Sequence, residues 1–339
     1  MLTIDGSHGE GGGQILRYAI ALSVFSKKDV LIKNIRAKRP KPGLRPQHLT
    51  AISCMKTLCN ANVEGLFIGS SNLLFKPKDI TTGYYNFDIG TAGSITLIFQ
   101  ACILSALKSK SIINIKIKGG TDVKWSPSWA YFTNVFLPII CSMGIKIDFE
   151  LIKRGYYPKG GGEALIKIHT IKNINSIKLE NNNYFDNISG IIHVSNLPEH
   201  IVKRIKHSAI QQAVKNNLQI SIRIDESPAL SPGVGVTIWS KSGFSILGSC
   251  FLGEIGIPAE KIGIDAVNLL IEEIKSKATI DSYAFDQILP YMVIAKDTSI
   301  CHVKKLSNHS NTAIWLLKQF FDFKIDISRH ENSIFIKVN

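Results

Sequence analysis

The chain has 339 residues, of which 45% are hydrophobic and 19% are charged, a composition that excludes a disordered protein and allows a full core in roughly two domains. Lysine and arginine number 40 against 26 aspartates and glutamates, and the formal net charge of +14 favours a polyanionic partner such as nucleic acid. The sequence shows no signal peptide, no apolar run of membrane-spanning length and no C-x-x-C pair among its six cysteines, so we expect a cytoplasmic protein with no membrane contact, disulfide framework or zinc site.

The chain opens with the strand-like segment MLTID and a glycine-rich turn, GEGGGQILR, at residues 9–17. Its three glycines lie between Glu10 and a helical segment that contains Arg17. Glycine lets backbone N–H groups approach a ligand closely, and the N-terminus of a helix attracts anions. A tight turn from a strand into a helix accounts for the same residues, so the motif alone leaves a phosphate loop and a plain turn open.

A unit of structure recurs along the chain with a period of about eighty residues. Residues 13–35 and 93–117 each consist of a glycine, an apolar helix of about four turns, a short Lys/Ser break and a β-branched strand. A second helix marked by proline follows each strand, and two short strands close each unit. These later segments are 42–59, 63–69 and 72–77 in the first unit and 126–144, 145–151 and 162–168 in the second.

The last part of the chain repeats this order and is interrupted by a separate domain. A helix at 284–296, a strand at 299–306, a helix at 309–321 and a hairpin at 323–339 form the third unit. Residues between the second and third units do not fit the period and read as a small α/β domain with a polar entry linker at 172–187. We therefore predict an α/β (α+β) fold, in which a large domain (1–183 and 278–339) of three repeated βαβαββ units carries a smaller inserted α/β domain (184–277).

Equivalent helix starts in repeated units should point toward one central region, so their polar residues are candidate site residues. The stretch IRAKRPKPGLRPQH precedes the second helix and holds Arg36, Lys38, Arg39, Lys41 and Arg45. A solvated charged loop is the ordinary explanation of such a run. The interleaved proline and glycine fix the backbone and arginine suits bidentate phosphate recognition, so we favour phosphate binding.

The second and third units add further polar residues at their helices. Gln100 lies in the otherwise apolar helix LIFQACIL, and a buried amide there needs partners, which are either structural or a ligand. Tyr283 and Asp286 lie in YAFDQ. A second glycine-rich loop, RGYYPKGGGEALI at 154–166, precedes a strand and reads more readily as a hairpin turn than as a second phosphate loop.

His309 is the most informative of the nine histidines. It falls in the first turn of a predicted helix, with Ser307 or Asn308 as N-cap. The positive end of the helix disfavours imidazolium, so we expect a neutral, nucleophilic ring that could attack phosphorus and form a phosphoramidate. Spacing alone, however, favours a capping or surface histidine. His8, His48 and His302 have no second histidine or cysteine at i+2 to i+4 with which to bind a metal ion.

Several ordered motifs resemble those of the RNA 3′-terminal phosphate cyclases. They are DGSHGEGGGQILR, RPKPGLRPQHL, GGTDV, RGYYPKGGG, FLGEIGIPAEKIG, YAFDQ and HSNT, and the match extends from residue 3 nearly to the C-terminus. The resemblance implies the same repeated fold with its insert. It also implies an enzyme that uses ATP to convert an RNA 3′-terminal phosphate to a 2′,3′-cyclic phosphate, through a covalent histidyl-AMP intermediate and an RNA-adenylate anhydride.

The resemblance also implies roles for individual residues. His309 matches the histidine that becomes adenylylated, and Glu10 matches an acid near the triphosphate and its divalent cation, Mg²⁺ or Mn²⁺. Arg17 and Arg39 match positions that handle phosphate and substrate, and Tyr283 and Pro127 match residues that flank the adenine. The implied nucleotide site as a whole comprises Gly11, Gly12, Gly13, Gln47, Gln100, Pro127, Tyr283 and Asp286.

Two departures and two other functions stand beside this interpretation. Ile255 occupies a place where the family usually has a basic residue, and Ala130 a place where many members have an acid. A family relative that acts in pre-rRNA processing and ribosome biogenesis lacks the nucleophilic histidine and the acidic glycine motif, whereas Glu10, Arg17 and His309 are present in this chain. A non-catalytic basic RNA-binding protein would explain the charge but not the residues at the helix starts. The sequence leaves the oligomeric state open, a homodimer included.

Overall fold

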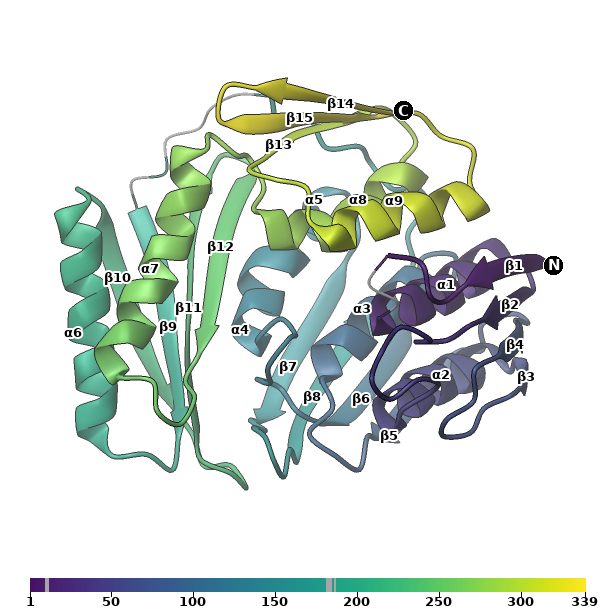
Figure 1. The fold of residues 1–339 in the computed structure, drawn as a ribbon, viewed down its shortest axis with the longest axis horizontal. Helices are drawn as coiled ribbons and strands as arrows, with labels where there is room; N and C mark the ends of the chain where they lie inside the picture. The colour runs from purple at the N-terminus through teal and green to yellow at the C-terminus, as the bar shows by residue number, and fades with distance from the viewer. Residues whose placement is uncertain (10–11, 181–184, 186) are drawn as a thin grey trace.

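The structure is a computed structural model that describes residues 1–9, 12–180, 185 and 187–339. Four small sheets and the helices packed on them make up the molecule, and the predicted mixed α/β fold is confirmed (Figure 1). Within the described ranges, no helix is both long enough and apolar enough to cross a membrane.

The first two repeated units have the same sheet topology. In each unit two parallel strands are followed by an antiparallel hairpin, and the sheet order is β1-β2-β4-β3 in the first unit and β5-β6-β8-β7 in the second. The first unit comprises β1 (Leu2–Asp5), α1 (Gly13–Ser26), β2 (Val30–Lys33), α2 (Pro46–Cys59), β3 (Asn62–Glu64) and β4 (Leu73–Lys76). The second comprises β5 (Gly83–Asp88), α3 (Ile95–Ala106), β6 (Ile113–Gly119), α4 (Trp129–Tyr131), η1 (Phe132–Phe136), α5 (Leu137–Ser142), β7 (Ile147–Lys153) and β8 (Gly162–Ile168).

The second helix of the second unit differs from a regular α-helix. Its middle turn, η1, is a π-helix, and Pro138 lies at the start of the following α5. Proline has no backbone N–H to donate and its ring crowds the preceding turn, which a local π-turn accommodates. Sequence periodicity predicts one continuous helix here, because the apolar pattern is the same on either side of the proline.

The third unit begins before the insert and ends after it. Lys178 forms a parallel bridge with Ile300, where β1 and β5 stand in the other units, and Leu179 N–H donates to Ile300 O at 2.9 Å. The segment predicted as an entry linker, 172–187, therefore contributes one backbone bridge at the place that β1 and β5 occupy in the other units. The rest of the unit is α8 (Ser282–Ile294), β13 (Ser299–Val303), α9 (Asn308–Phe320), β14 (Ile325–His330) and β15 (Ser333–Val338), with sheet order β13-β15-β14.

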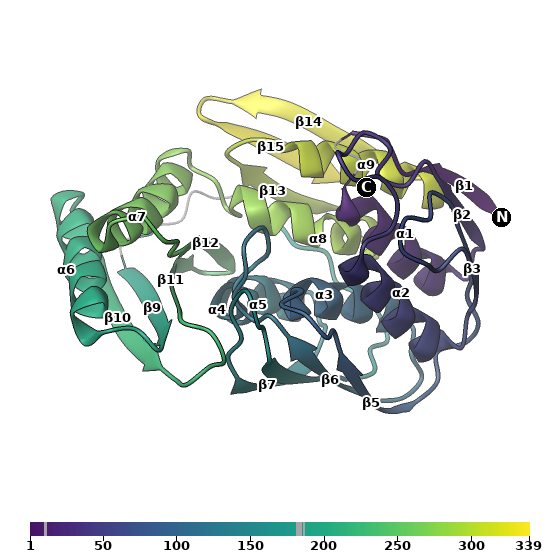
Figure 2. The same cartoon turned by 60° about the horizontal axis from the view of Figure 1, so that its bottom comes forward.

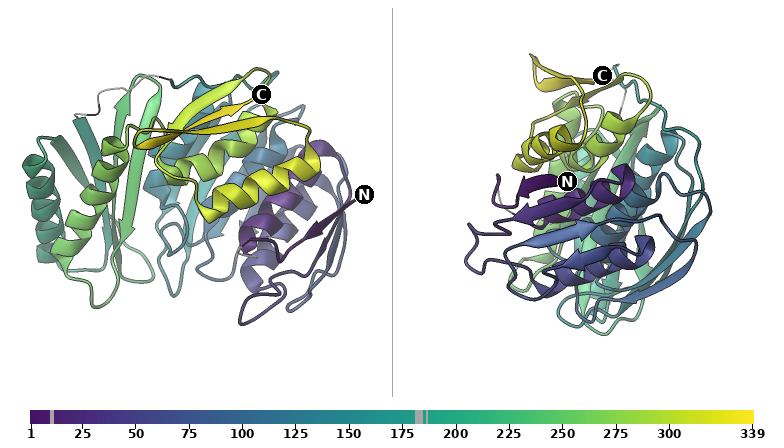
Figure 3. Two further views of the ribbon diagram at one scale, coloured as in Figure 1. Left: turned by 45° about the horizontal axis from the view of Figure 1, so that its top comes forward. Right: turned by 90° about the vertical axis from the view of Figure 1, so that its right-hand side faces the viewer.

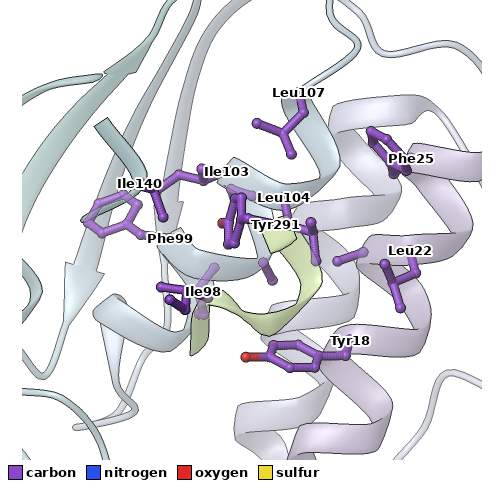
Figure 4. Packing of buried hydrophobic residues seen from close by; sticks show 14 of the residues in the cluster. Tyr18, Leu22, Phe25, Ile98, Phe99, Ile103, Leu104, Leu107, Ile140 and Tyr291 are labelled. Atoms are coloured by element: carbon purple, nitrogen blue, oxygen red, sulfur yellow. The ribbon is translucent and has the colours of Figure 1, made fainter. Parts of the chain in front are cut away.

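The helices of the three units close into a ring around a shared core. The first helices α1, α3 and α8 meet at the centre, where Tyr18, Phe99 and Tyr291 are buried (Figure 4). The second helix of each unit packs on the first helix of the next: α2 on α3, η1 and α5 on α8, and α9 on α1. The end of the chain is thereby brought against its beginning, as the views in Figures 2 and 3 show for α9 and α1.

A second hydrophobic core lies in the elements between Lys178 and α8. Helices α6 and α7 pack together over the sheet β10-β9-β11-β12 (Figure 1). Ile192 and Val236 of the sheet and Leu270 of α7 are buried in this core. The predicted boundary at 183 and 184 lies outside the described residues, so the domain limits stay a prediction. The elements are β9 (Asn187–Ser195), α6 (Glu199–Lys215), β10 (Gln219–Glu226), β11 (Gly233–Ser242), β12 (Ser245–Leu252) and α7 (Ala259–Lys275).

A buried ionic network fixes this second core against the repeated units. Arg154 Nη1 donates to Asp122 at 2.7 Å and Arg154 Nε to Asp225 at 3.2 Å, while Tyr156 Oη lies 2.9 Å from His193 Nδ1. Burial lowers the pKa of His193 to about 4 despite the nearby Asp122, so this ring is neutral at physiological pH. Arg154 therefore carries the positive charge that keeps the buried Asp122 ionised.

Candidate active site

The N-termini of α1 and α9 meet where the third unit packs on the first, and a glutamine joins them. Gln14 Nε2 donates to the carbonyl oxygen of His309 at 3.2 Å, and Gln14 Oε1 lies 2.9 Å from His309 Nδ1. Because the amide nitrogen already faces a carbonyl, the end that faces the ring is the acceptor. The two residues are 295 positions apart in the chain.

This arrangement fixes the tautomer of His309. Since Gln14 Oε1 can only accept, Nδ1 carries the hydrogen, and in a neutral ring the lone pair is then on Nε2. His309 is an exposed residue. Sequence spacing alone favours a capping or surface histidine. The structure places His309 in the first turn of α9, as predicted. The N-cap of this helix is Ser307, so His309 itself is not the capping residue.

Asp286 organises the N-terminus of α9 from the neighbouring helix α8. Ser307 Oγ donates to the Asp286 carboxylate at 2.8 Å, and Ser310 Oγ also donates to it. Ser307 Oγ in turn accepts the N–H of Ser310 at 3.0 Å, which caps the helix. Asp286 is 7% exposed, and its carboxylate thus holds the helix start that presents His309.

Basic side chains gather at the glycine turn before α1. The N-cap of α1 is Gly12, which has no side chain to cover the first N–H groups of the helix. A β-carbon added at Gly12 would lie 3.6 Å from Arg39 Nη2, and one added at Gly13 would lie 2.9 Å from Arg17 Nη1. The guanidinium groups therefore approach the backbone closely at these two glycines. Glu10 and Gly11, predicted as a metal ligand and a nucleotide contact, lie outside the described residues.

Burial disfavours the charged form of the arginines at this turn. It lowers the pKa of Arg17 and, with the charges of Arg39 and Arg45, the pKa of Arg36. Among the described residues no recorded ion pair involves Arg17, Arg36 or Arg45. A helix N-terminus together with half-buried guanidinium groups is an environment that an anion stabilises.

The start of α8 carries Tyr283, another of the candidate site residues. Asp281 is the N-cap and accepts the N–H groups of Tyr283 and Ala284, the Tyr131 hydroxyl and the N–H of Gly248. Burial raises its pKa to about 6 although these donors favour the charged form. Tyr283, two residues later, is 62% exposed, as a ring that stacks on a ligand must be.

Two predicted nucleotide residues have protein partners in this region. Gln100 Nε2 donates to Gln287 Oε1, and Gln287 Nε2 donates to the carbonyl oxygen of Tyr283 at 2.7 Å. The carbonyl oxygen of Pro127 accepts the hydroxyl of Thr96 at 2.9 Å. Hydrogen bonds thus link Gln100, which is in α3, to α8, and link Pro127 to α3.

The site brings together most, but not all, of the predicted residues. Gln47 lies at the start of α2, where its β-carbon is 3.8 Å from a β-carbon added at Gly93, beside the first helix of the second unit. Sequence reasoning offered Ser307 only as an N-cap and Gln14 only as a polar residue at a helix start, and it assigned no role to Ser310, Asp281 or Gln287. The same rule of polar residues at helix starts could have found Ser310 and Asp281, whereas Gln287 lies in the second turn of α8.

The donor set for a divalent cation cannot be completed from the described residues. Within 1–9, 12–180, 185 and 187–339, no group of three or more His, Cys, Asp or Glu side chains is arranged to hold a metal ion.

Of the two departures from the family pattern, Ala130 is 1% exposed inside α4, and Ile255 is fully exposed in the loop before α7. Neither touches His309 or the arginines of the glycine turn.

The chain is similar to known proteins over its whole length. A family model described as RNA 3′-terminal phosphate cyclase matches residues 8–327. Proteins named RNA 3′-terminal phosphate cyclase are 42% identical in Pyrococcus furiosus over 322 residues, with 95% of this chain and 93% of the relative covered, and 40% identical in Methanosarcina barkeri, with both chains fully covered. A protein of the same name from Nitrosospira multiformis is 38% identical over 339 residues and covers 99% of this chain and 96% of the relative.

Proposed function

The chain belongs to the RNA 3′-terminal phosphate cyclase family, and on this premise we propose that it uses ATP to convert a 3′-terminal phosphate of RNA to a 2′,3′-cyclic phosphate. The observation that carries the proposal is the combination of an exposed His309, whose Nδ1 is held by Gln14, and a helix start without a side-chain cap beside half-buried arginines. A nucleophile and an anion site of this kind suit nucleotidyl transfer.

In the first step His309 Nε2 attacks the α-phosphorus of ATP. A nitrogen–phosphorus bond forms, the α–β anhydride bond breaks, and pyrophosphate leaves. The positive charge that develops on the ring is delocalised to the Nδ1–H group, which already donates to Gln14 Oε1. Arg17, Arg39 and the N–H groups of α1 stabilise the negative charge on the phosphates.

Two further displacements complete the reaction. An oxygen of the RNA 3′-phosphate attacks the same phosphorus, which frees His309 and forms an RNA-adenylate anhydride. The neighbouring 2′-hydroxyl then attacks the terminal RNA phosphorus, loses its proton, and AMP leaves with the electrons of the anhydride bond. This last step is intramolecular and therefore gains strongly from proximity.

Other predicted residues take supporting roles in this proposal. Tyr283 and Pro127 flank the adenine, with Gln100 linked through Gln287 to the backbone of Tyr283, and Gln47 handles phosphate at the edge of the site. A divalent cation, Mg²⁺ or Mn²⁺, held by Glu10 would neutralise negative charge on the leaving pyrophosphate. The net charge of +14 provides affinity for the RNA backbone that falls as salt rises.

Transfer of label from ATP tests the enzyme against its alternatives. Protein incubated with α-labelled ATP should acquire acid-labile label, and a 3′-phosphorylated oligonucleotide should yield a cyclic end only with ATP. His309→Ala should abolish both signals, while His207→Ala, an exposed histidine on α6, should change neither. RNA binding without label or cyclic product would instead support a processing factor or a non-catalytic RNA-binding protein.

A further inference from the structure

His48 is a buried histidine next to the glycine turn, and its tautomer is fixed by the backbone. It occupies the third position of α2 and is 1% exposed. Its Nδ1 lies 3.1 Å from the backbone nitrogen of Arg45, the N-cap residue of that helix. A backbone N–H can only donate, so Nδ1 is the acceptor and the hydrogen of the neutral ring lies on Nε2. The side chain thus satisfies an N–H group at the start of α2.

The Nε2–H group of His48 points to the start of α1. Nε2 is buried and makes no hydrogen bond within the described part of the chain. A β-carbon added at Gly13 would lie 2.9 Å from His48 Nε2 and 2.9 Å from Arg17 Nη1, so both donors converge on the first residue of α1. A buried donor without a protein partner costs free energy, and such groups in folded proteins usually serve a ligand or another special purpose.

The surroundings keep His48 neutral. Burial, together with the charges of Arg17, Arg36 and Arg45, lowers its pKa to about 3. The ring can therefore donate a hydrogen bond at any physiological pH without adding another positive charge. A neutral donor adds directionality to the site, whereas a further cation would increase the repulsion among the arginines.

We infer that His48 Nε2–H donates to an oxygen of a phosphate group bound at the N-terminus of α1, together with Arg17. The inference rests on the proposed function and adds to it a neutral phosphate-binding residue in the first unit. The phosphate can belong to the triphosphate of ATP or to the 3′ end of the RNA. The chemistry is the same for both, and the experiment below separates them.

Two substitutions divide the roles of the two ring nitrogens. In His48→Asn the side-chain oxygen can accept the Arg45 N–H in place of Nδ1, but no donor reaches the position of Nε2. In His48→Gln the amide nitrogen reaches about the position of Nε2 and can donate to the phosphate. If the role of His48 were only to support α2, the asparagine variant would preserve function better than the glutamine variant. Phosphate binding predicts the opposite order.

Calorimetric titration with three probes measures the effect. The probes are ATP, pyrophosphate, and a 3′-phosphorylated oligonucleotide compared with the same oligonucleotide ending in a 3′-hydroxyl. His48→Asn should weaken binding of the phosphate source by about 10- to 100-fold, and His48→Gln should recover most of that loss. Loss for ATP and pyrophosphate alone assigns His48 to the triphosphate, and loss of the preference for the 3′-phosphate assigns it to the RNA. Unchanged affinity of His48→Asn for every probe would overturn the inference.

A wild-type measurement guards against an unstable variant and against failure of the proposed enzyme activity. In protein labelled with ¹⁵N-histidine, the resonances of His48 should show hydrogen on Nε2, and saturation with pyrophosphate or the 3′-phosphorylated oligonucleotide should shift that signal. Its absence from the His48→Gln spectrum assigns it. A signal that no phosphate probe moves would count against the inference. These binding results stand even if the protein acquires no label from ATP, an outcome that would refute only the proposed reaction.

Discussion

Replacement of Gln14 by methionine isolates the contact that joins the two ends of the chain at His309. Methionine has a similar length but can neither donate to the His309 carbonyl nor accept from Nδ1 as an amide oxygen does, so both hydrogen bonds at 3.2 Å and 2.9 Å are lost. In the ground state these are exposed, neutral bonds worth about 0.5–1.5 kcal/mol each. The thermal midpoint should therefore fall only slightly.

The effect on nucleotidyl transfer should be larger than the effect on stability. As Nε2 attacks phosphorus, the ring becomes positively charged and the bond from Nδ1 to Gln14 becomes charge-assisted, worth about 1.5–3 kcal/mol. The rate of label transfer at saturating ATP should then fall by about 10- to 150-fold, while the ATP concentration that gives half the maximal rate should stay nearly constant. This split identifies Gln14 as a positioning residue, because the amide touches the ring and not the nucleotide.

The assay is single-turnover transfer from α-labelled ATP over a range of ATP concentrations. Gln14→Glu keeps an acceptor for Nδ1 and should retain more activity than Gln14→Met. Gln211→Met, at an exposed position on α6, is the matched control and should transfer label like the wild type. Transfer by Gln14→Met at the wild-type rate would refute the assignment of the His309 tautomer to Gln14.

Three further predictions concern stability. Asp286→Ala removes the acceptor that holds the start of α9, so calorimetry should show a loss of about 2–3 kcal/mol, together with weaker label transfer. Arg154→Met leaves Asp122 buried without its cation, and denaturant unfolding should show a loss of about 3–5 kcal/mol. His193 has its pKa lowered to about 4 by burial, so the unfolded chain takes up a proton first as pH falls from about 6.5. Stability should decrease from pH 6.5 toward pH 4 by up to about 3 kcal/mol, and His193→Gln should flatten this part of the curve of thermal midpoint against pH.

A specific result would contradict each of these three stability predictions. Wild-type stability of Asp286→Ala would mean that the serine caps of α9 need no anchor, and a tolerated Arg154→Met would mean that Asp122 is protonated in the folded state. An unaltered pH dependence in His193→Gln would assign acid sensitivity to other groups, of which the buried His48 is the first candidate.

The helix-start rule selects residues whose signal in the sequence is local. Arg17, Gln100, Tyr283, Asp286 and His309 were singled out because a polar residue in an apolar helical pattern, or at its start, is visible in a short window of sequence. The partners of these residues were not visible. Gln287 next to Gln100 and Ser310 next to Asp286 are ordinary polar residues whose importance depends on which helix packs beside them.

The backbone bridge at Lys178 is not predicted from the sequence for a related reason. Residues 172–187 are polar and carry no alternation, so they read as a linker, yet Ile177 and Leu179 exchange backbone hydrogen bonds with Ile300. Backbone pairing needs no particular side chain, and a single bridge leaves little trace in the sequence. Conversely, the hairpin turn predicted at 154–166 is present between β7 and β8, because its glycines allow the close backbone approach of Gly155 to Gly162.

The sequence by itself determined the local elements, their repetition, the basic charge and the family, because each depends on residue types within a short span or on an ordered set of motifs. The tertiary structure alone decided that the start of α1 meets the start of α9, since that contact follows from the ring in which each unit's second helix buries its apolar face on the first helix of the next. Packing closes this ring between the last unit and the first. His309 and Gln14 are therefore neighbours in space because the apolar helix faces must all be covered, although 295 positions separate them in the chain.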